Sequence, residues 1–169
     1  MKTITYEEFL EFTPCYLHNP EKKALMDSIA RRKECWTALD ILGLEEIPDE
    51  DKLWCVLRKE LIEPEKLHKF ACACAERALS RVGNPDPRSV AGIAAKRAWL
   101  RGEITDAELK HAWAAARTAK GGAAEVAARA AAEVDAEVAA LVAACAAEMA
   151  AERGWQVKEL KEMLKGEAQ

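Results

Sequence analysis

The sequence lacks the motifs by which many enzymes and metalloproteins are identified. It contains no phosphate-binding glycine loop, no Gly-x-Ser-x-Gly, no His-Glu-x-x-His and no Cys-x-x-Cys. The first of these motifs binds phosphate, the second supplies an acyl-transfer nucleophile, and the last two supply zinc ligands. Their absence predicts that the chain is not an enzyme and uses no cofactor.

Long apolar runs are also missing. No stretch approaches the roughly 18 residues that a membrane-spanning helix needs, and the acidic start, MKTITYEEFLEF, has no apolar core of a signal peptide. We therefore expect no membrane contact and a cytoplasmic location. The six cysteines are scattered, and in that compartment we expect them to be reduced core residues.

The alternation of apolar and polar residues that is typical of strands is absent, whereas helix signals recur. Asn19-Pro20, Glu63-Pro64 and Asp86-Pro87 each place a proline at a first helical position. Thr105 with Glu108 forms a capping box. Short turns separate these segments, so the sequence predicts an all-α fold, a helical bundle of about seven or eight helices.

The C-terminal part is dominated by alanine, the residue with the best helix propensity. Its larger apolar residues recur every three or four positions, which predicts one long helix over 123–153 that ends at Gly154. These residues are Val126, Val134, Val138, Leu141, Val142, Cys145 and Met149. Glu125 and Arg129 form a supporting pair, and a short terminal helix follows.

The chain is accordingly divided into a helical domain, 1–120, and an alanine-rich part, 123–169. The first domain has an N-terminal part, 1–62, and a second part, 63–120. The stripe of small residues on the long helix also makes a homodimer plausible.

Five carboxylates cluster in the turn before the helix at 49–61. They are Glu45, Glu46, Asp49, Glu50 and Asp51. One interpretation is a solvated loop in which Asp49 caps the helix and the others favour its dipole. The other is an acidic patch that meets a basic surface of a partner protein.

A basic helix offers a different kind of partner. It carries Arg88, Lys96, Arg97, Trp99 and Arg101, and residues 86–120 have a net charge of +3, whereas residues 121–152 have −5. Cations beside an aromatic ring can contact phosphates, so nucleic-acid binding is the alternative function. The simpler interpretation is ordinary solvated charge on a chain of net charge −4.

One helix face could hold a metal ion or a Cys/His nucleophile, because His68, Cys72 and Glu76 are four residues apart. A transition-metal site needs three or four ligands, and His18 and His111 have no ligand motif around them. We therefore expect a partly buried helix face here and no metal.

Three segments between Leu67 and Trp113 carry a family resemblance: FACACAERAL at 70–79, the turn at 84–88, and AAKRAWLRGEITDAEL at 94–109. They resemble helical immunity proteins of the Imm-5-like kind. EEFLEF, RRKECWTALDIL and EDKLWCVLRKE, earlier in the chain, resemble uncharacterised alanine-rich proteins of phages, prophages and gut bacteria.

The resemblance implies a non-enzymatic inhibitor from a phage or another mobile element. Its partner would be a bacterial defence nuclease, as for an anti-CRISPR protein, or a toxin, as for an immunity protein. The acidic turn at 45–51 and the long alanine-rich helix are the two surfaces that could bind such a partner.

Overall fold

The computed structural model describes residues 2–119, 122–131, 133, 135–145 and 150–166. Ten α-helices make up most of this part, so the predicted all-α class is confirmed. In chain order the elements are β1 (Thr3–Thr5), α1 (Tyr6–Leu10), the 3-10 helix η1 (Cys15–His18), α2 (Pro20–Ala30), β2 (Cys35–Thr37), α3 (Ala38–Leu42), α4 (Asp49–Val56), α5 (Pro64–Ser80), α6 (Pro87–Leu100), α7 (Asp106–Arg117), α8 (Ala123–Ala131), α9 (Ala136–Cys145) and α10 (Ala150–Lys165).

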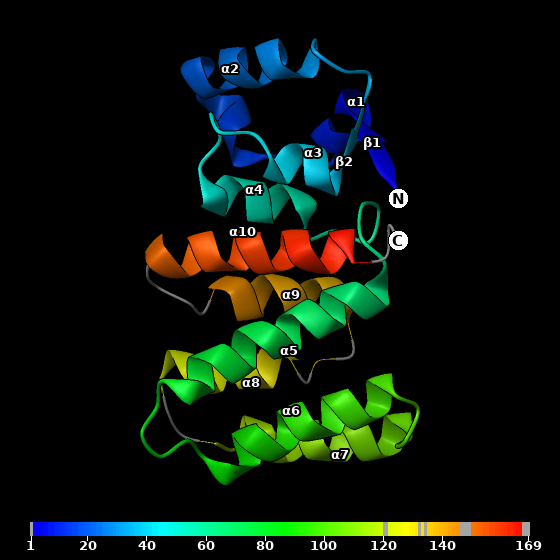
Figure 1. The fold of residues 1–169 in the computed structure, drawn as a ribbon, viewed down its shortest axis with the longest axis vertical. Coiled ribbons are helices and arrows are strands. Elements are labelled where there is room, and N and C mark those ends of the chain that lie inside the picture. The colour runs from blue at the N-terminus through cyan, green and yellow to red at the C-terminus, as the bar shows by residue number, and fades with distance from the viewer. Residues whose placement is uncertain (1, 120–121, 132, 134, 146–149, 167–169) are drawn as a thin grey trace.

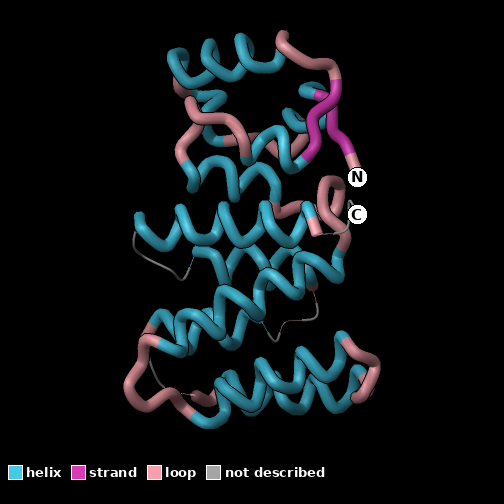
Figure 2. The backbone as a smooth tube through the Cα atoms, in the orientation of Figure 1, coloured by secondary structure: helices cyan, strands magenta, loops and turns pink. Residues whose placement is uncertain are grey.

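The helices are stacked in layers along the long axis of the molecule (Figures 1 and 2). Helix α2 lies at one end, followed by the two strands with α1, α3 and α4, and α6 with α7 lies at the other end. Helix α10 lies between the two halves, against α3 and α4 on one side and α5 on the other. None of the helices in the described part has the length and apolar character of a membrane-crossing segment.

Helix α5 is the centre of the C-terminal half, where it packs against α6, α8, α9 and α10. The helical spacing predicts a buried stripe of Leu67, Phe70, Ala71, Cys74 and Ala78; the first four are buried, whereas Ala78 is half-buried. The facing surfaces of α8 and α9 bury mainly alanines, whose small side chains let helix axes approach closely. Those that are at most 1% exposed are Ala127, Ala128, Ala131, Ala139, Ala140, Ala143 and Ala144.

The prediction of one long helix over 123–153 is wrong. Helix α8 ends at Ala131 and α9 begins at Ala136, where the Asp135 carboxylate accepts a hydrogen bond from the Val138 amide at 2.9 Å. The two helices pack against each other and against α5. Alanine favours helix at every position, so a run of alanines does not indicate where one helix ends and the chain turns back. Packing of the apolar faces on α5 decides that.

The predicted stripe on this segment also needs correction. Val138 and Val142 are 49% and 37% exposed, and the alanines beside them face the core instead. Val134 and Met149 lie outside the described residues, as do the side chains of Leu141, Cys145, Glu125 and Arg129. Gly154 does not end a helix, because α10 continues through it to Lys165.

A two-stranded antiparallel ribbon is the other feature that the sequence did not predict. Strand β1 pairs with β2, with Thr3 opposite Thr37 and Ile4 opposite Trp36. Both segments are rich in β-branched and aromatic residues, but three residues are too few to show an alternating pattern. Each strand leads directly into a capping box, formed by Thr5 with Glu8 in α1 and by Thr37 with Asp40 in α3.

The predicted helix starts at Asn19, Asp86 and Thr105 are confirmed. The side chains of Asn19, Asp86 and Thr105 accept amide hydrogen bonds at the starts of α2, α6 and α7. At the end of α6, Gly102 adopts a φ of 72°, in the left-handed region that favours glycine. The amide of Glu103 then donates to the carbonyl oxygen of Ala98, which closes this helix.

Candidate functional site

An apolar groove of about 390 Å³ lies beside α2 and α4, at the turn that carries the predicted acidic residues. Its apolar lining comes from η1 and the residue before it, from α2, from the turn and from α4. These residues are Pro14, Tyr16, Leu25, Met26, Ile47, Pro48, Trp54 and Cys55. Glu46, Glu50, Asp51 and Lys22 also line it, and their exposure places them at its edge.

Trp54 gives the groove a fixed aromatic wall. The Arg58 guanidinium lies 4.6 Å from the centre of its indole and 4.8 Å from the ring of Phe12. On another side, the indole meets the ring of Phe9 edge-on, with centroids 6.1 Å apart. These contacts restrict rotation of the Trp54 side chain, so the groove keeps this wall in the free protein.

Three of the five predicted carboxylates, Glu46, Glu50 and Asp51, line this groove, whereas Glu45 and Asp49 lie in the same segment but do not line it. Three of the five have partners within the chain: Glu46 pairs with Arg32, Asp49 with Lys52 at 3.0 Å, and Asp51 with Lys22 at 3.6 Å. The hydrogen bond from Arg32 lowers the pKa of Glu46. Glu45 and Glu50 are exposed and form no ion pair with any described side chain. The edge of the groove therefore retains negative charge.

Asp49 does not have the capping role that the first interpretation predicted. The N-cap of α4 is Pro48, which has no side-chain hydrogen bond, and Asp49 is the first helical residue. The acidic first turn, Asp49 to Asp51, still lies where the helix dipole favours carboxylates. The helix is also shorter than predicted and ends at Val56.

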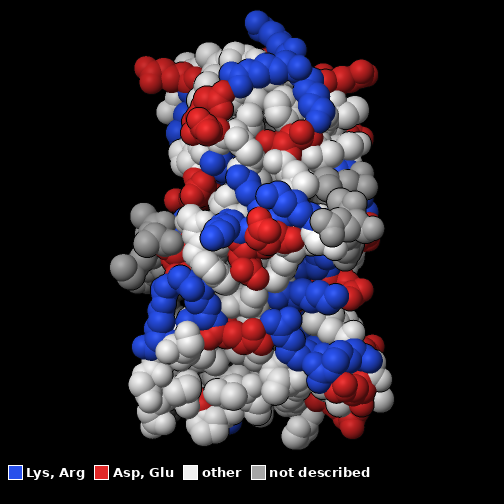
Figure 3. Space-filling model, in the orientation of Figure 1, with Lys and Arg blue, Asp and Glu red and all other residues white. Residues whose placement is uncertain are grey.

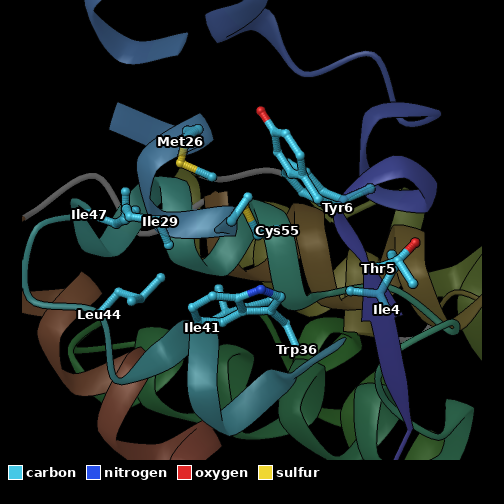
Figure 4. Close-up of a pocket in the computed structure, with 12 residues that line it drawn as sticks. Ile4, Thr5, Tyr6, Met26, Ile29, Trp36, Ile41, Leu44, Ile47 and Cys55 are labelled. Atoms are coloured by element: carbon cyan, nitrogen blue, oxygen red, sulfur yellow. The ribbon is translucent and has the colours of Figure 1, made fainter. Parts of the chain in front are cut away.

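A second, smaller cavity of about 50 Å³ adjoins the groove (Figure 4). Met26, Ile47 and Cys55 line both spaces. Ile29 of α2 lies on the opposite side of this cavity from Trp36 and Ile41. Its wall is almost entirely apolar. The residues of this wall come from the ribbon, α1 and α2 as well as from α3 and α4.

One side-chain hydrogen bond joins α2 to α1 beside this cavity. The Tyr6 hydroxyl of α1 donates to Asp27 Oδ1 at 2.7 Å, and within α2 the Lys23 ammonium donates to Asp27 Oδ2 at 2.7 Å. The bonds from Lys23 and from Tyr6 both lower the pKa of Asp27. The Tyr16 hydroxyl lies 3.4 Å from that of Tyr6, and burial is the main cause that raises the pKa of Tyr16.

The predicted nucleic-acid-binding residues of α6 are held within the molecule. Lys96 is fully buried and its ammonium donates to the Glu133 carbonyl oxygen at 2.6 Å. Arg97 donates two hydrogen bonds to Glu76, at 2.8 and 2.9 Å. Lys96 therefore cannot reach a phosphate on the surface.

The remaining members of that set are also engaged. Arg88 pairs with Asp86 and Arg101 with Glu103, each at 2.6 Å, and the Trp99 indole donates to Asp106. Lys and Arg side chains intermingle with Asp and Glu over the face seen in Figure 3.

The residues considered for a metal or a nucleophile do not form such a site. Burial raises the pKa of Cys72 to about 11, so its thiol is protonated at neutral pH. The His68 ring is buried and meets Trp99 edge-on at 5.3 Å, and Glu76 is bound to Arg97. Within the described residues, no cluster of His, Cys, Asp and Glu is arranged to hold a metal ion.

Sequence reasoning found the carboxylates but missed the apolar part of the groove. The helical spacing predicts Leu25 on the inner face of its helix, yet this side chain is 38% exposed and lines the groove. Nothing in the sequence around Trp54 distinguishes a tryptophan that lines a groove from one that is buried in the core. Comparison of the chain with protein-family models, curated proteins and solved structures finds no match.

Proposed function

We propose that this chain is a stoichiometric, non-enzymatic protein inhibitor whose groove binds a basic amphipathic segment of its partner. One observation carries the proposal: a single groove of about 390 Å³ combines an apolar wall that includes Trp54 with a carboxylate edge. The function is therefore recognition of another protein, without turnover.

The two kinds of surface have separate roles in such binding. Tyr and Trp often contribute much of the binding free energy at protein interfaces, and an apolar groove suits one face of an amphipathic helix. Carboxylates at the edge attract Lys and Arg and repel acidic segments, which gives specificity and speeds association. The carboxylate of Glu50 is available for this, because it lines the groove and no described side chain pairs with it.

This chemistry selects a class of partner. A protein that binds nucleic acid presents Lys and Arg to phosphates, and a chain that covers these cations blocks that contact. A bacterial defence nuclease or a toxin would be inhibited in this way, in the phage or mobile-element setting that the family resemblance implies. The alternative, nucleic-acid binding through α6, has less support because Lys96 is buried and its basic neighbours are paired.

A peptide-display selection tests the proposal directly, because random peptides can stand in for the partner. We expect the wild-type chain to enrich peptides with apolar residues flanked by Lys or Arg. Reversing two charges that line the groove, with Glu46→Lys and Glu50→Lys, should weaken binding of a selected peptide at least about tenfold, because like charges then face each other. Binding is measured by calorimetric titration at two salt concentrations.

The matched control reverses two exposed carboxylates that do not line the groove, with Glu7→Lys and Glu60→Lys. This variant should bind within about twofold of wild type. Equal loss in both variants, or enrichment of acidic peptides, would refute the groove as the recognition surface. A nuclease with a segment of the selected type should lose activity at one equivalent of the chain, and full activity at a saturating concentration contradicts inhibition.

A further inference from the structure

The cavity beside the groove has the size of one aliphatic side chain. On the same measure of free space, a water molecule occupies about 10–15 Å³. A cavity of about 50 Å³ thus holds roughly three to five water-sized groups. Leucine has a side chain of this size, and valine fills less of the space.

The chemistry of the wall excludes a polar occupant. Ile4, Phe9 and Ile41 are buried and line the cavity together with Ile29 and Trp36. A water molecule needs several polar partners to remain in a buried space, and this wall offers almost none. An apolar side chain loses nothing by entering and gains contacts on all sides.

The cavity is partly open, and α2, which forms one side of it, is lightly packed. Ile29 is the one buried residue of this fully described helix. Its other attachments to the rest of the chain include the ion pair of Lys22 with Asp51, at 3.6 Å, and the hydrogen bond from Tyr6 to Asp27. A small displacement of α2 therefore disturbs little core.

Met26 marks the boundary between the groove and the cavity. It comes from α2, is half-buried and lines both spaces. Its unbranched thioether side chain has three rotatable bonds and adapts easily to a new neighbour. Ile47 and Cys55 share this boundary, and Met26 is its most adaptable member.

We infer that this cavity is an anchor pocket that takes one leucine-sized side chain from the basic segment bound in the groove. The inference rests on the proposed function, because the segment is the one whose Lys and Arg residues meet the carboxylate edge. Charge complementarity at the groove carboxylates, Glu50 above all, brings the segment in, and the anchor side chain then passes Met26 into the apolar space.

The test uses two synthetic helical peptides built from Lys and Ala. One has a single central leucine, and the other has alanine at that position. We expect the leucine peptide to bind wild type at least about tenfold more tightly, since even one methylene in an apolar pocket is worth that factor. The dissociation constants are measured by NMR titration of the full chain.

Filling the cavity should abolish this preference. Ala30 lines the cavity but not the groove, so Ala30→Leu places three more carbon atoms there. In this variant both peptides should bind alike, within about twofold, with the affinity that the alanine peptide has for wild type. Ala24→Leu makes the same change at an exposed position of α2 and should keep the full preference. Ile29→Phe is a second filling variant if circular dichroism shows that Ala30→Leu does not fold.

The remaining outcomes distinguish failure of the anchor pocket from failure of the proposed function. Equal binding of the two peptides to wild type, still weakened by Glu46→Lys with Glu50→Lys, overturns the anchor pocket and leaves the proposed function intact. A leucine preference that persists in both filling variants places the anchor elsewhere and also overturns it. If neither peptide binds at millimolar concentration, the anchor pocket and the basic-segment proposal both fail.

Discussion

The most unusual single residue is Lys96, a cation with no exposed surface. Its ammonium lies 4.1 Å from the centre of the Trp99 ring and donates to the Glu133 carbonyl oxygen. A ring face and a carbonyl compensate only part of the lost hydration, and burial lowers the pKa of Lys96 to about 8. The lysine thus joins α6 to the segment between α8 and α9, and its charge opposes folding.

The contribution of Lys96 to the free energy of unfolding should therefore increase as the pH rises in alkaline solution. Its pKa is about 8 in the fold and near 10.5 in the unfolded chain, so between these values the unfolded state binds more protons. This contribution is roughly 1–3 kcal/mol across the window. Unfolding by urea at pH 7.5 and pH 10, for wild type and Lys96→Met, measures it.

The comparison with Lys96→Met is needed because other groups titrate in the same range. Burial raises the pKa of Cys72 to about 11, so this thiol makes stability fall above its ordinary pKa. The charge of Lys96 itself acts on the Cys72 thiol, so the two proteins are also compared in a Cys72→Ala background, where the difference between their pH slopes isolates Lys96. Identical slopes would show that Lys96 keeps an ordinary pKa in the fold.

At the scale of elements, α2 and α5 are opposite extremes. Helix α2 buries one residue, whereas α5 buries eight and contacts four other helices. We expect amide hydrogens of α2 to exchange at least about a hundredfold faster than those of α5, because local opening of α2 exposes little apolar surface. Exchange measured by mass spectrometry checks this. Similar protection of the two helices would contradict an α2 that yields to an incoming side chain.

The elements that the sequence predicts well are those with local punctuation. Asn19, Asp86 and Thr105 begin helices because their side chains accept hydrogen bonds within the same turn, which needs no other part of the chain. The break between α8 and α9 depends instead on packing against α5, which a run of alanines does not reveal. The groove is harder still, because it depends on how far α2 stands from α4. The acidic residues at its edge were identifiable by charge alone.

The two halves of the molecule are joined largely through α10, which contacts α3 and α4 as well as α5. Leu160 is a fully buried residue of this helix. We expect Leu160→Ala to lower the free energy of unfolding by about 2–5 kcal/mol, through lost burial and the space left behind. Weakened coupling should also separate the melting of α1–α4 from that of α5–α9 in calorimetry.

The control for this substitution is Val90→Ala, which truncates a valine that is 47% exposed on α6. It should change the free energy of unfolding by no more than about 0.5 kcal/mol and leave the shape of the transition as in wild type. A single, equally sharp transition in Leu160→Ala would mean that the halves unfold together without help from α10.

The alanine-lined contact of α5 with α8 and α9 reverses the usual relation between the size of a residue and its freedom to vary. Ala139 and Ala140 are completely enclosed, whereas Val138 beside them is 49% exposed. A larger side chain at either alanine has to push two helices apart, but many residues fit at the valine. At this contact the small alanines are therefore the positions that tolerate substitution least, and the larger Val138 is a position that tolerates it well.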